Sequence, residues 1–220
     1  MRTAVLTLLL CLISAAPAAA AEVDLRVAPG GGVVLGEEHR LSGTLSENGA
    51  PLGGRVVTLE ARRHPYTDAF APLDTATTGP EGEFRFTEAL DRNHEVRVVA
   101  VEAGAASPAV RAYVFPRGRL SVRTVRRNVV RIRQTLTVTR NAGLRGLTRF
   151  YVGPRRSRTA RFAGAARPRR VRPDRYVAEV DVRIPRRYRG RFSYGACIRT
   201  TGESRFGDPG ERCPRRRFRF

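Results

Sequence analysis

The sequence contains no lysine, so all 41 of its basic residues are arginine. Two explanations account for this choice. A planar guanidinium binds carboxylate and phosphate groups through two parallel hydrogen bonds, which an ammonium group does not. Alternatively, GC-rich codons favour arginine over lysine throughout a genome. The absence of lysine from both halves of the chain favours the codon explanation, but the positive charge acts physically under either one.

The sequence also lacks the motifs of common catalytic sites. It has no HExxH pair, no Gly-x-Ser-x-Gly elbow, no P-loop and no Gly-x-Gly-x-x-Gly turn. Its three histidines are His39, His64 and His94, and no metal-ligand spacing relates them. His64 precedes a proline and His94 follows a turn signal, so we expect both at the surface or in loops. We expect no enzyme activity, no metal, no cofactor and no small-molecule substrate.

Long apolar runs are confined to the N-terminus. Arg2 precedes an apolar segment from Ala4 to Ile13, and small residues follow through Ala21. A positive start, a short apolar middle and an Ala-x-Ala exit are typical of a secretory signal peptide, here residues 1–21. The segment is too short to span a membrane comfortably. We expect a secreted, extracellular protein whose retention at a cell envelope would be non-covalent, since no sorting motif follows.

Cysteine is scarce, with three in the chain. Cys11 belongs to the predicted signal peptide, which leaves Cys197 and Cys213 in an oxidising compartment. We therefore predict a Cys197–Cys213 disulfide. In the chain-entropy model, a loop of about 15 residues contributes roughly 3 kcal/mol to stability. Two cysteines without nearby histidines do not form a zinc site.

Acidic residues are unevenly distributed. Residues 22–115 contain 9 arginines and 14 acidic residues, a net charge of −5, whereas residues 117–220 contain 31 arginines and 6 acidic residues, a net charge of +25. Such asymmetry indicates two domains, one of which is suited to contact a polyanion. We expect an acidic domain at 22–115, a hinge at 116–118 and a basic domain at 119–220.

The fold class follows from 21 glycines and 14 prolines combined with period-two alternation and little helical periodicity. We predict an all-β protein of two tandem Ig-like β-sandwich domains. The expected strands of the first domain are 39–45, 55–62, 73–78, 83–87, 95–102 and 109–115. Those of the second are 119–125, 130–138, 148–152, 158–162, 176–184, 192–198 and 215–220. We expect Val57, Leu59, Ala61, Phe84 and Phe86 in the first core.

The first domain resembles a known group of modules. Leu41–Leu45, Ala50–Leu59 and Thr78–Phe86 follow the order of strands and turns in bacterial Ig-like and carboxypeptidase-regulatory-like domains of secreted proteins, although Gly79 stands where those domains usually have aspartate. The resemblance covers roughly Val33–Phe115. It implies a non-catalytic spacer, adhesion or accessory binding role. The second domain matches no family, and its Ig-like assignment rests on strand spacing alone.

Arginines cluster without apolar alternation in two segments that we expect to be loops, 154–158 and 167–173. With residues after 184, they form the predicted polyanion-binding set: Arg155, Arg156, Arg158, Arg167, Arg169, Arg170, Arg172, Arg186, Arg187 and Arg189. The expected partners are an anionic cell-envelope polymer or a membrane surface. The alternative is an interaction or spacer module that docks onto an acidic protein.

Two other features of the basic half have simpler interpretations. Aromatic residues next to arginine, as at Phe150 and Tyr151, could form stacking platforms for nucleic acid. We expect them instead to face the core, and secretion would separate the protein from intracellular nucleic acid. Glu179 and Asp181 share a strand face and could form an acid–base pair, but we expect them to form salt bridges with neighbouring arginines.

Overall fold

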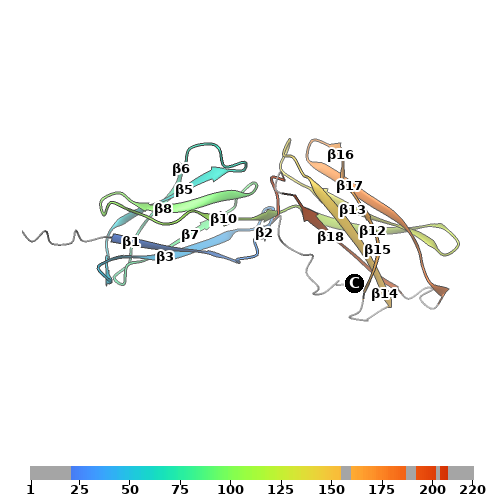
Figure 1. Ribbon diagram of the computed structural model, residues 1–220, viewed down its shortest axis with the longest axis horizontal. Helices are drawn as coiled ribbons and strands as arrows, with labels where there is room; N and C mark the ends of the chain where they lie inside the picture. The colour runs from blue at the N-terminus through green and yellow to red at the C-terminus, as the bar shows by residue number, and fades with distance from the viewer. Residues whose placement is uncertain (1–20, 155–159, 187–191, 202–203, 208–220) are drawn as a thin grey trace, which may run out of the picture.

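The computed structural model describes residues 21–154, 160–186, 192–201 and 204–207. The part of the chain it describes is all-β and contains no α-helix. Figure 1 shows two β-rich units that lie end to end. Pro116 lies between the last strand of the first unit, Val114–Phe115, and the first strand of the second, Arg117–Arg126. No helix among the described residues is long and apolar enough to cross a membrane.

The N-terminal unit consists of two facing sheets (Figure 1). Its strands are β1 (Ala21–Ala28), β2 (Val33–Val34), β3 (His39–Glu47), β4 (Ala50–Pro51), β5 (Val56–Arg63), β6 (Ala71–Thr77), β7 (Glu83–Glu88), β8 (His94–Ala100), β9 (Ala105–Ala106), β10 (Val110–Ala112) and β11 (Val114–Phe115). One sheet has the order β1-β3-β4 with β7 also pairing β3, and the other has the order β10-β8-β5-β6 with β9 on β8. The short strands β2 and β11 pair in parallel.

The alternation of apolar and polar residues explains how these sheets pack. Successive side chains of a strand point to opposite faces, so a period-two pattern places one set inside. In β7, Phe84 and Phe86 are buried while their neighbours are exposed. In β5, Val57 and Leu59 are fully buried, and Ala61 packs against the same core. The predicted core residues of this unit are therefore confirmed.

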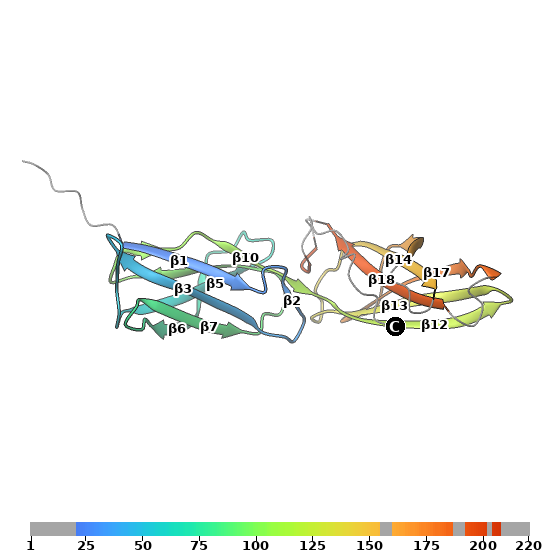
Figure 2. The same cartoon turned by 90° about the horizontal axis from the view of Figure 1, so that it is seen from below.

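The C-terminal unit also has two sheets. Its strands are β12 (Arg117–Arg126), β13 (Val129–Thr137), β14 (Gly146–Pro154), β15 (Arg161–Ala166), β16 (Arg169–Arg172), β17 (Arg175–Arg183) and β18 (Phe192–Thr200). One sheet has the order β12-β13-β17-β16 and the other β15-β14-β18. Ile132, Ala178 and Phe150 are fully buried between them and belong to one core. Figure 2 shows the two sheets as separate layers.

Two strand predictions in this unit were wrong. Residues 169–172, predicted as loop, form the edge strand β16, in which every residue is exposed. An edge strand with neither face in the core has no apolar alternation, so its sequence carries no strand pattern. The strand expected at 158–162 instead spans Arg161–Ala166 as β15. The final predicted strand, 215–220, lies outside the described residues.

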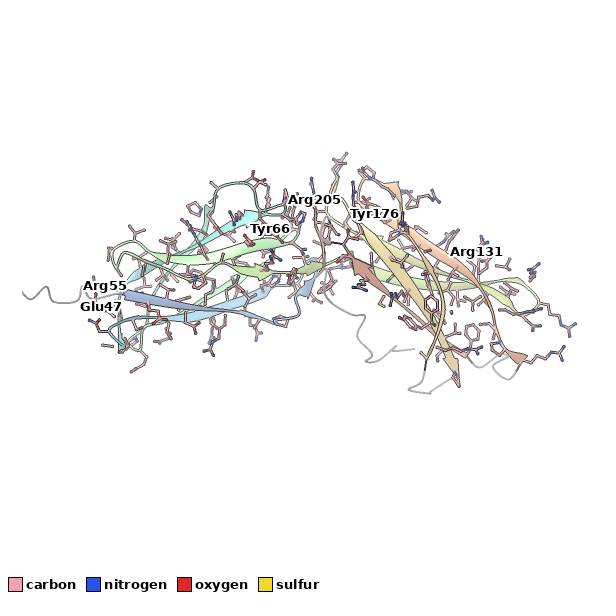
Figure 3. All side chains as sticks on the ribbon, in the orientation of Figure 1. Glu47, Arg55, Tyr66, Arg131, Tyr176 and Arg205 are labelled. Carbon is pink, nitrogen blue, oxygen red and sulfur yellow. The ribbon has the colours of Figure 1, made fainter. Side chains whose placement is uncertain are left out.

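The two units meet in a packed junction. Phe206 is fully buried and belongs to the same apolar cluster as the core of the N-terminal unit. Asn93, only 1% exposed, accepts a hydrogen bond from Val114 N through Oδ1 (2.9 Å) and donates from Nδ2 to Gly207 O (2.8 Å). Its own N–H donates to Arg205 O at 2.9 Å. Arg205 and Tyr176 mark the end of the C-terminal unit that faces the junction in Figure 3. One asparagine thus links both units and the connecting strand β11.

Candidate anion-binding surface

The structure describes only part of the predicted polyanion-binding set. Five of those residues lie outside the described ranges: Arg155, Arg156, Arg158, Arg187 and Arg189. The other five are exposed: Arg167, Arg169, Arg170, Arg172 and Arg186. These five do not form one patch.

The described arginines divide between two places. Arg169, Arg170 and Arg172 lie on β16, which pairs with the start of β17, where Arg172 lies opposite Arg175. Arg186 lies beyond the other end of β17. At the rise per residue of an extended strand, it is about 30 Å from Val177, the residue opposite Arg169. Arg170 is also held locally, because it donates hydrogen bonds to Asn141 Oδ1 (2.8 Å) and to the carbonyl of Pro173 (3.4 Å).

Arg167 belongs to a different feature, a groove of about 720 Å³ in the C-terminal unit. We call it the arginine groove. Its described lining contains no acidic residue and consists of Leu144, Arg145, Gly146, Leu147, Arg149, Arg167, Pro168, Arg199, Thr200 and Thr201. No carboxylate of the described chain forms an ion pair with Arg149, Arg167 or Arg199. Several guanidinium groups around one concave surface create a positive potential that attracts anions.

Strand pairing brings the groove residues together. β14 is the central strand of its sheet, and Leu147 pairs with Arg199 on β18. On the other side, Thr148 pairs with Ala166, so Arg167 follows immediately beyond the last paired residue of β15. Arg149 lies one row further, opposite Cys197. Three segments far apart in the sequence therefore supply guanidinium groups to one face.

A close backbone approach shapes the end of the groove near the junction. A Cβ atom on Gly146 would lie 2.9 Å from the Cα of Thr200 and would collide with the carbonyl of Arg199. Glycine therefore permits β14 and β18 to start their pairing here. The adjoining loop is held by two hydrogen bonds, from Thr201 N to Arg145 O (3.2 Å) and from Arg145 N to Ser204 Oγ (3.4 Å).

On the outer face of the opposite sheet, β12-β13-β17-β16, two arginines form ion pairs with carboxylates. Arg131 binds Asp181 with Nε 2.6 Å from Oδ1, and Arg133 lies 2.8 Å from Glu179. The hydrogen bond from Arg131 lowers the pKa of Asp181 below its ordinary value. The predicted salt-bridge role of Glu179 and Asp181 is confirmed. Figure 3 labels Arg131 on this face, where both Arg131 and Arg133 have a carboxylate partner.

Sequence reasoning identified Arg167 but missed Arg145, Arg149 and Arg199. Arg149 lies on the expected strand 148–152 and Arg199 directly after the expected strand 192–198, outside the segments from which the predicted set was chosen. The two neighbours of Arg149 along the strand, Thr148 and Phe150, are both fully buried, so Arg149 points to the outer face. The missing information was the pairing of β14 with β18, which no local pattern contains.

The predicted surface position of His94 is wrong, because this residue is only 6% exposed. His39 is fully buried. Each ring donates one hydrogen bond to a carbonyl, His94 Nδ1 to Arg92 O (2.8 Å) and His39 Nε2 to Tyr113 O (3.1 Å). Burial lowers the pKa of both imidazoles. Each lies at the start of a strand, His39 opposite Glu88 and His94 opposite Arg63 and Ala112. In the described ranges, no group of three or more His, Cys, Asp or Glu residues is placed to hold a metal ion.

The predicted disulfide involves Cys197, which is half-buried on β18. Its predicted partner, Cys213, lies outside the described residues, as do residues 1–20 of the predicted signal peptide. Both features therefore remain predictions.

Comparison with known proteins assigns no family to this chain. No family model matches the sequence, and no curated protein matches it. Among solved structures, the chain is similar to the red sea bream transglutaminase, with 10% sequence identity and a TM-score of 0.34. That alignment covers 84% of this chain and 30% of the transglutaminase chain. A likeness this distant assigns neither an activity nor a family.

Proposed function

We propose that this protein is a secreted, non-catalytic binding module of a bacterial cell envelope, and that its C-terminal unit holds anionic surface polymers in the arginine groove. The observation that carries this proposal is the groove itself, in which Arg149, Arg167 and Arg199 line one concavity without an acidic residue in the described lining. Guanidinium groups bind carboxylate and phosphate through paired, charge-assisted hydrogen bonds.

We also propose that both units are Ig-like domains. The order β12-β13-β17-β16 opposite β15-β14-β18 is the order A-B-E-D opposite C′-C-F of an immunoglobulin sandwich. In the N-terminal unit, β1-β3-β7 opposite β10-β8-β5-β6 follows the related order A-B-E opposite G-F-C-C′. The N-terminal unit would then act as a spacer that presents the basic unit.

The test is binding of the full secreted chain to soluble polyphosphate, polygalacturonate and neutral dextran, measured by calorimetry over a salt series. Exposed charges are screened beyond about 8 Å at physiological ionic strength. We expect binding to both anionic polymers, weakening steeply with salt, and none to dextran. Vesicles of phosphatidylglycerol serve as a further probe, because a lipid surface offers the same phosphate chemistry on a flat support.

Two triple variants with equal net charge separate a site from diffuse attraction. Substituting Arg149, Arg167 and Arg199 by serine removes groove charges, whereas substituting Arg123, Arg126 and Arg127 removes exposed charges at the β12–β13 turn. We expect the groove variant to lose at least about tenfold in affinity, which is 1.4 kcal/mol, and the turn variant to lose much less. Equal losses would refute the groove as the site. If the parent chain binds no anionic polymer at low salt, the proposed function is wrong.

A further inference from the structure

The outer face of the β15-β14-β18 sheet continues from the arginine groove and carries an aromatic pair, of which one ring is exposed and the other half-buried. On β14, Leu147, Arg149 and Tyr151 alternate with Thr148, Phe150 and Val152, which are fully or almost fully buried. Tyr151 therefore faces outward, contrary to the expectation that the aromatic residues here face the core. Its ring packs edge-on against Phe162, with centroids 6.1 Å apart and planes at 75°. Phe162 is 59% exposed.

Small residues lie opposite Arg149 on both neighbouring strands and opposite Tyr151 on one of them. Arg149 lies between Ala165 on β15 and Cys197 on β18, and Tyr151 lies opposite Gly195. On the other side of Tyr151, the ring of Phe162 lies opposite it on β15. Arg149 and Tyr151 are two residues apart on one strand, which separates their Cα atoms by about 6.7 Å. An aromatic pair and a guanidinium are thus neighbours on the outer face, and Arg149 also lines the groove.

We propose that this face and the arginine groove together bind an acidic polysaccharide, with uronate carboxylates on Arg149, Arg167 and Arg199 and the apolar face of a sugar ring against Tyr151 and Phe162. A sugar ring with a carboxylate offers both chemistries within one residue. The C–H face of the sugar ring replaces water over the exposed aromatic surface. The guanidinium groups donate paired hydrogen bonds to the carboxylates. This inference rests on the proposed function and narrows its ligand.

Two other polyanions fit the face less well. Proteins that bind single-stranded nucleic acid stack successive bases on a series of aromatic side chains, whereas the described part of this face offers one edge-on aromatic pair beside an excess of guanidinium groups. A flat lipid surface needs charge density alone and would leave a recessed groove of about 720 Å³ without a role.

The experiment compares three polyanions that share charge but differ in rings: polygalacturonate, polyphosphate and single-stranded oligothymidylate. The variants are Phe162→Ser, the conservative Phe162→Tyr, and Val171→Ser as a control at another exposed apolar position of the same unit. We expect Phe162→Ser to weaken polygalacturonate binding about fivefold or more, which corresponds to about 1 kcal/mol. Polyphosphate binding should be unchanged. Phe162→Tyr should restore the polygalacturonate affinity, and Val171→Ser should change neither.

The outcomes distinguish this inference from the function on which it rests. If Phe162→Ser leaves both affinities unchanged, or lowers both equally, the ring contact is wrong while anion binding in the groove stands. If oligothymidylate binds more tightly than polygalacturonate and loses affinity in Phe162→Ser, the face is a nucleic-acid platform and the polysaccharide proposal is overturned. If the parent binds none of the three, both proposals fail. Circular dichroism verifies that each variant is folded.

Discussion

At the residue scale, the burial of two histidines makes the free energy of unfolding depend on pH. His39 and His94 form neutral hydrogen bonds to carbonyls, and burial holds the pKa of each below the ordinary value of about 6.5. Between the lowered pKa and about 6.5, the unfolded chain binds protons that the native chain does not. The free energy of unfolding therefore rises with pH through this window and levels off above it.

We predict that acidification from about pH 7.5 to 5.5 destabilises the protein. A double variant, His39→Gln and His94→Asn, places an amide N–H near each donating ring nitrogen without a titrating group. It should show a flatter dependence of unfolding free energy on pH, measured by urea denaturation. If parent and double variant have the same slope, other groups cause the dependence.

A second residue-scale prediction concerns Asn93. Asn93→Ala removes a buried donor and a buried acceptor, and it leaves Val114 N and Gly207 O without these partners. Buried polar groups left unsatisfied cost about 1–3 kcal/mol. We expect a loss of that size in urea denaturation, against no measurable loss for the control Ser121→Ala, which is exposed on β12. Equal effects in the two variants would show that the Asn93 contacts contribute nothing to stability.

At the element scale, β18 connects the features of the basic unit. It pairs with β14 along its full length, contributes Arg199 to the arginine groove and carries Cys197 opposite Arg149. The predicted bond from Cys197 to Cys213 would attach the arginine-rich C-terminus, residues 215–219, to this same strand. The disulfide would therefore add positive charge beside the groove as well as stability.

We predict that the secreted protein contains one disulfide and no reactive thiol. Non-reducing peptide mapping should link Cys197 to Cys213, and N-terminal sequencing should start at Ala21 or Glu22. Replacing both cysteines by serine should lower the free energy of unfolding by about 3 kcal/mol. Two titratable thiols in protein recovered from an oxidising compartment would contradict the bond.

At the scale of the whole molecule, the junction determines whether the two units move independently. Phe206 packs into the apolar cluster of the N-terminal unit, and the N–H of Gly207 donates to Val114 O at 2.8 Å. Thr139 Oγ1 also donates to the carbonyl of Asp91. A junction with apolar contacts and paired backbone groups holds the units in one orientation, so the groove has a set position relative to the N-terminal unit.

We predict that Phe206→Ala loosens this arrangement. Truncating a buried phenylalanine costs about 3–5 kcal/mol, here at the junction between units. Small-angle scattering should show a broader distribution of distances than in the parent, and calorimetry should resolve two unfolding transitions. Phe162→Ala, at an exposed position, is the matched control and should change neither. Scattering identical to the parent for Phe206→Ala would show that other contacts hold the units together.

The sequence alone determined the all-β class, most of the strands and the core of the N-terminal unit. Period-two alternation is a local property, so Val57, Leu59, Phe84 and Phe86 could be assigned to the core without knowledge of any partner. The opposite charges of the two halves were likewise countable from composition.

Only the tertiary structure decided which arginines come together in the candidate anion-binding groove. The groove depends on the register between β14, β15 and β18, whose paired residues lie between 9 and 54 positions apart, and hydrogen-bonded pairing over such distances leaves no trace in a local window. β16 lacks alternation because both its faces are exposed, so its arginines were assigned to a loop. Asn93 belongs to a turn signal that indicates solvent, yet it is buried and hydrogen-bonded to Arg205 and Gly207 of the second unit. Burial there is a property of the contact between two units, which neither segment of sequence specifies by itself.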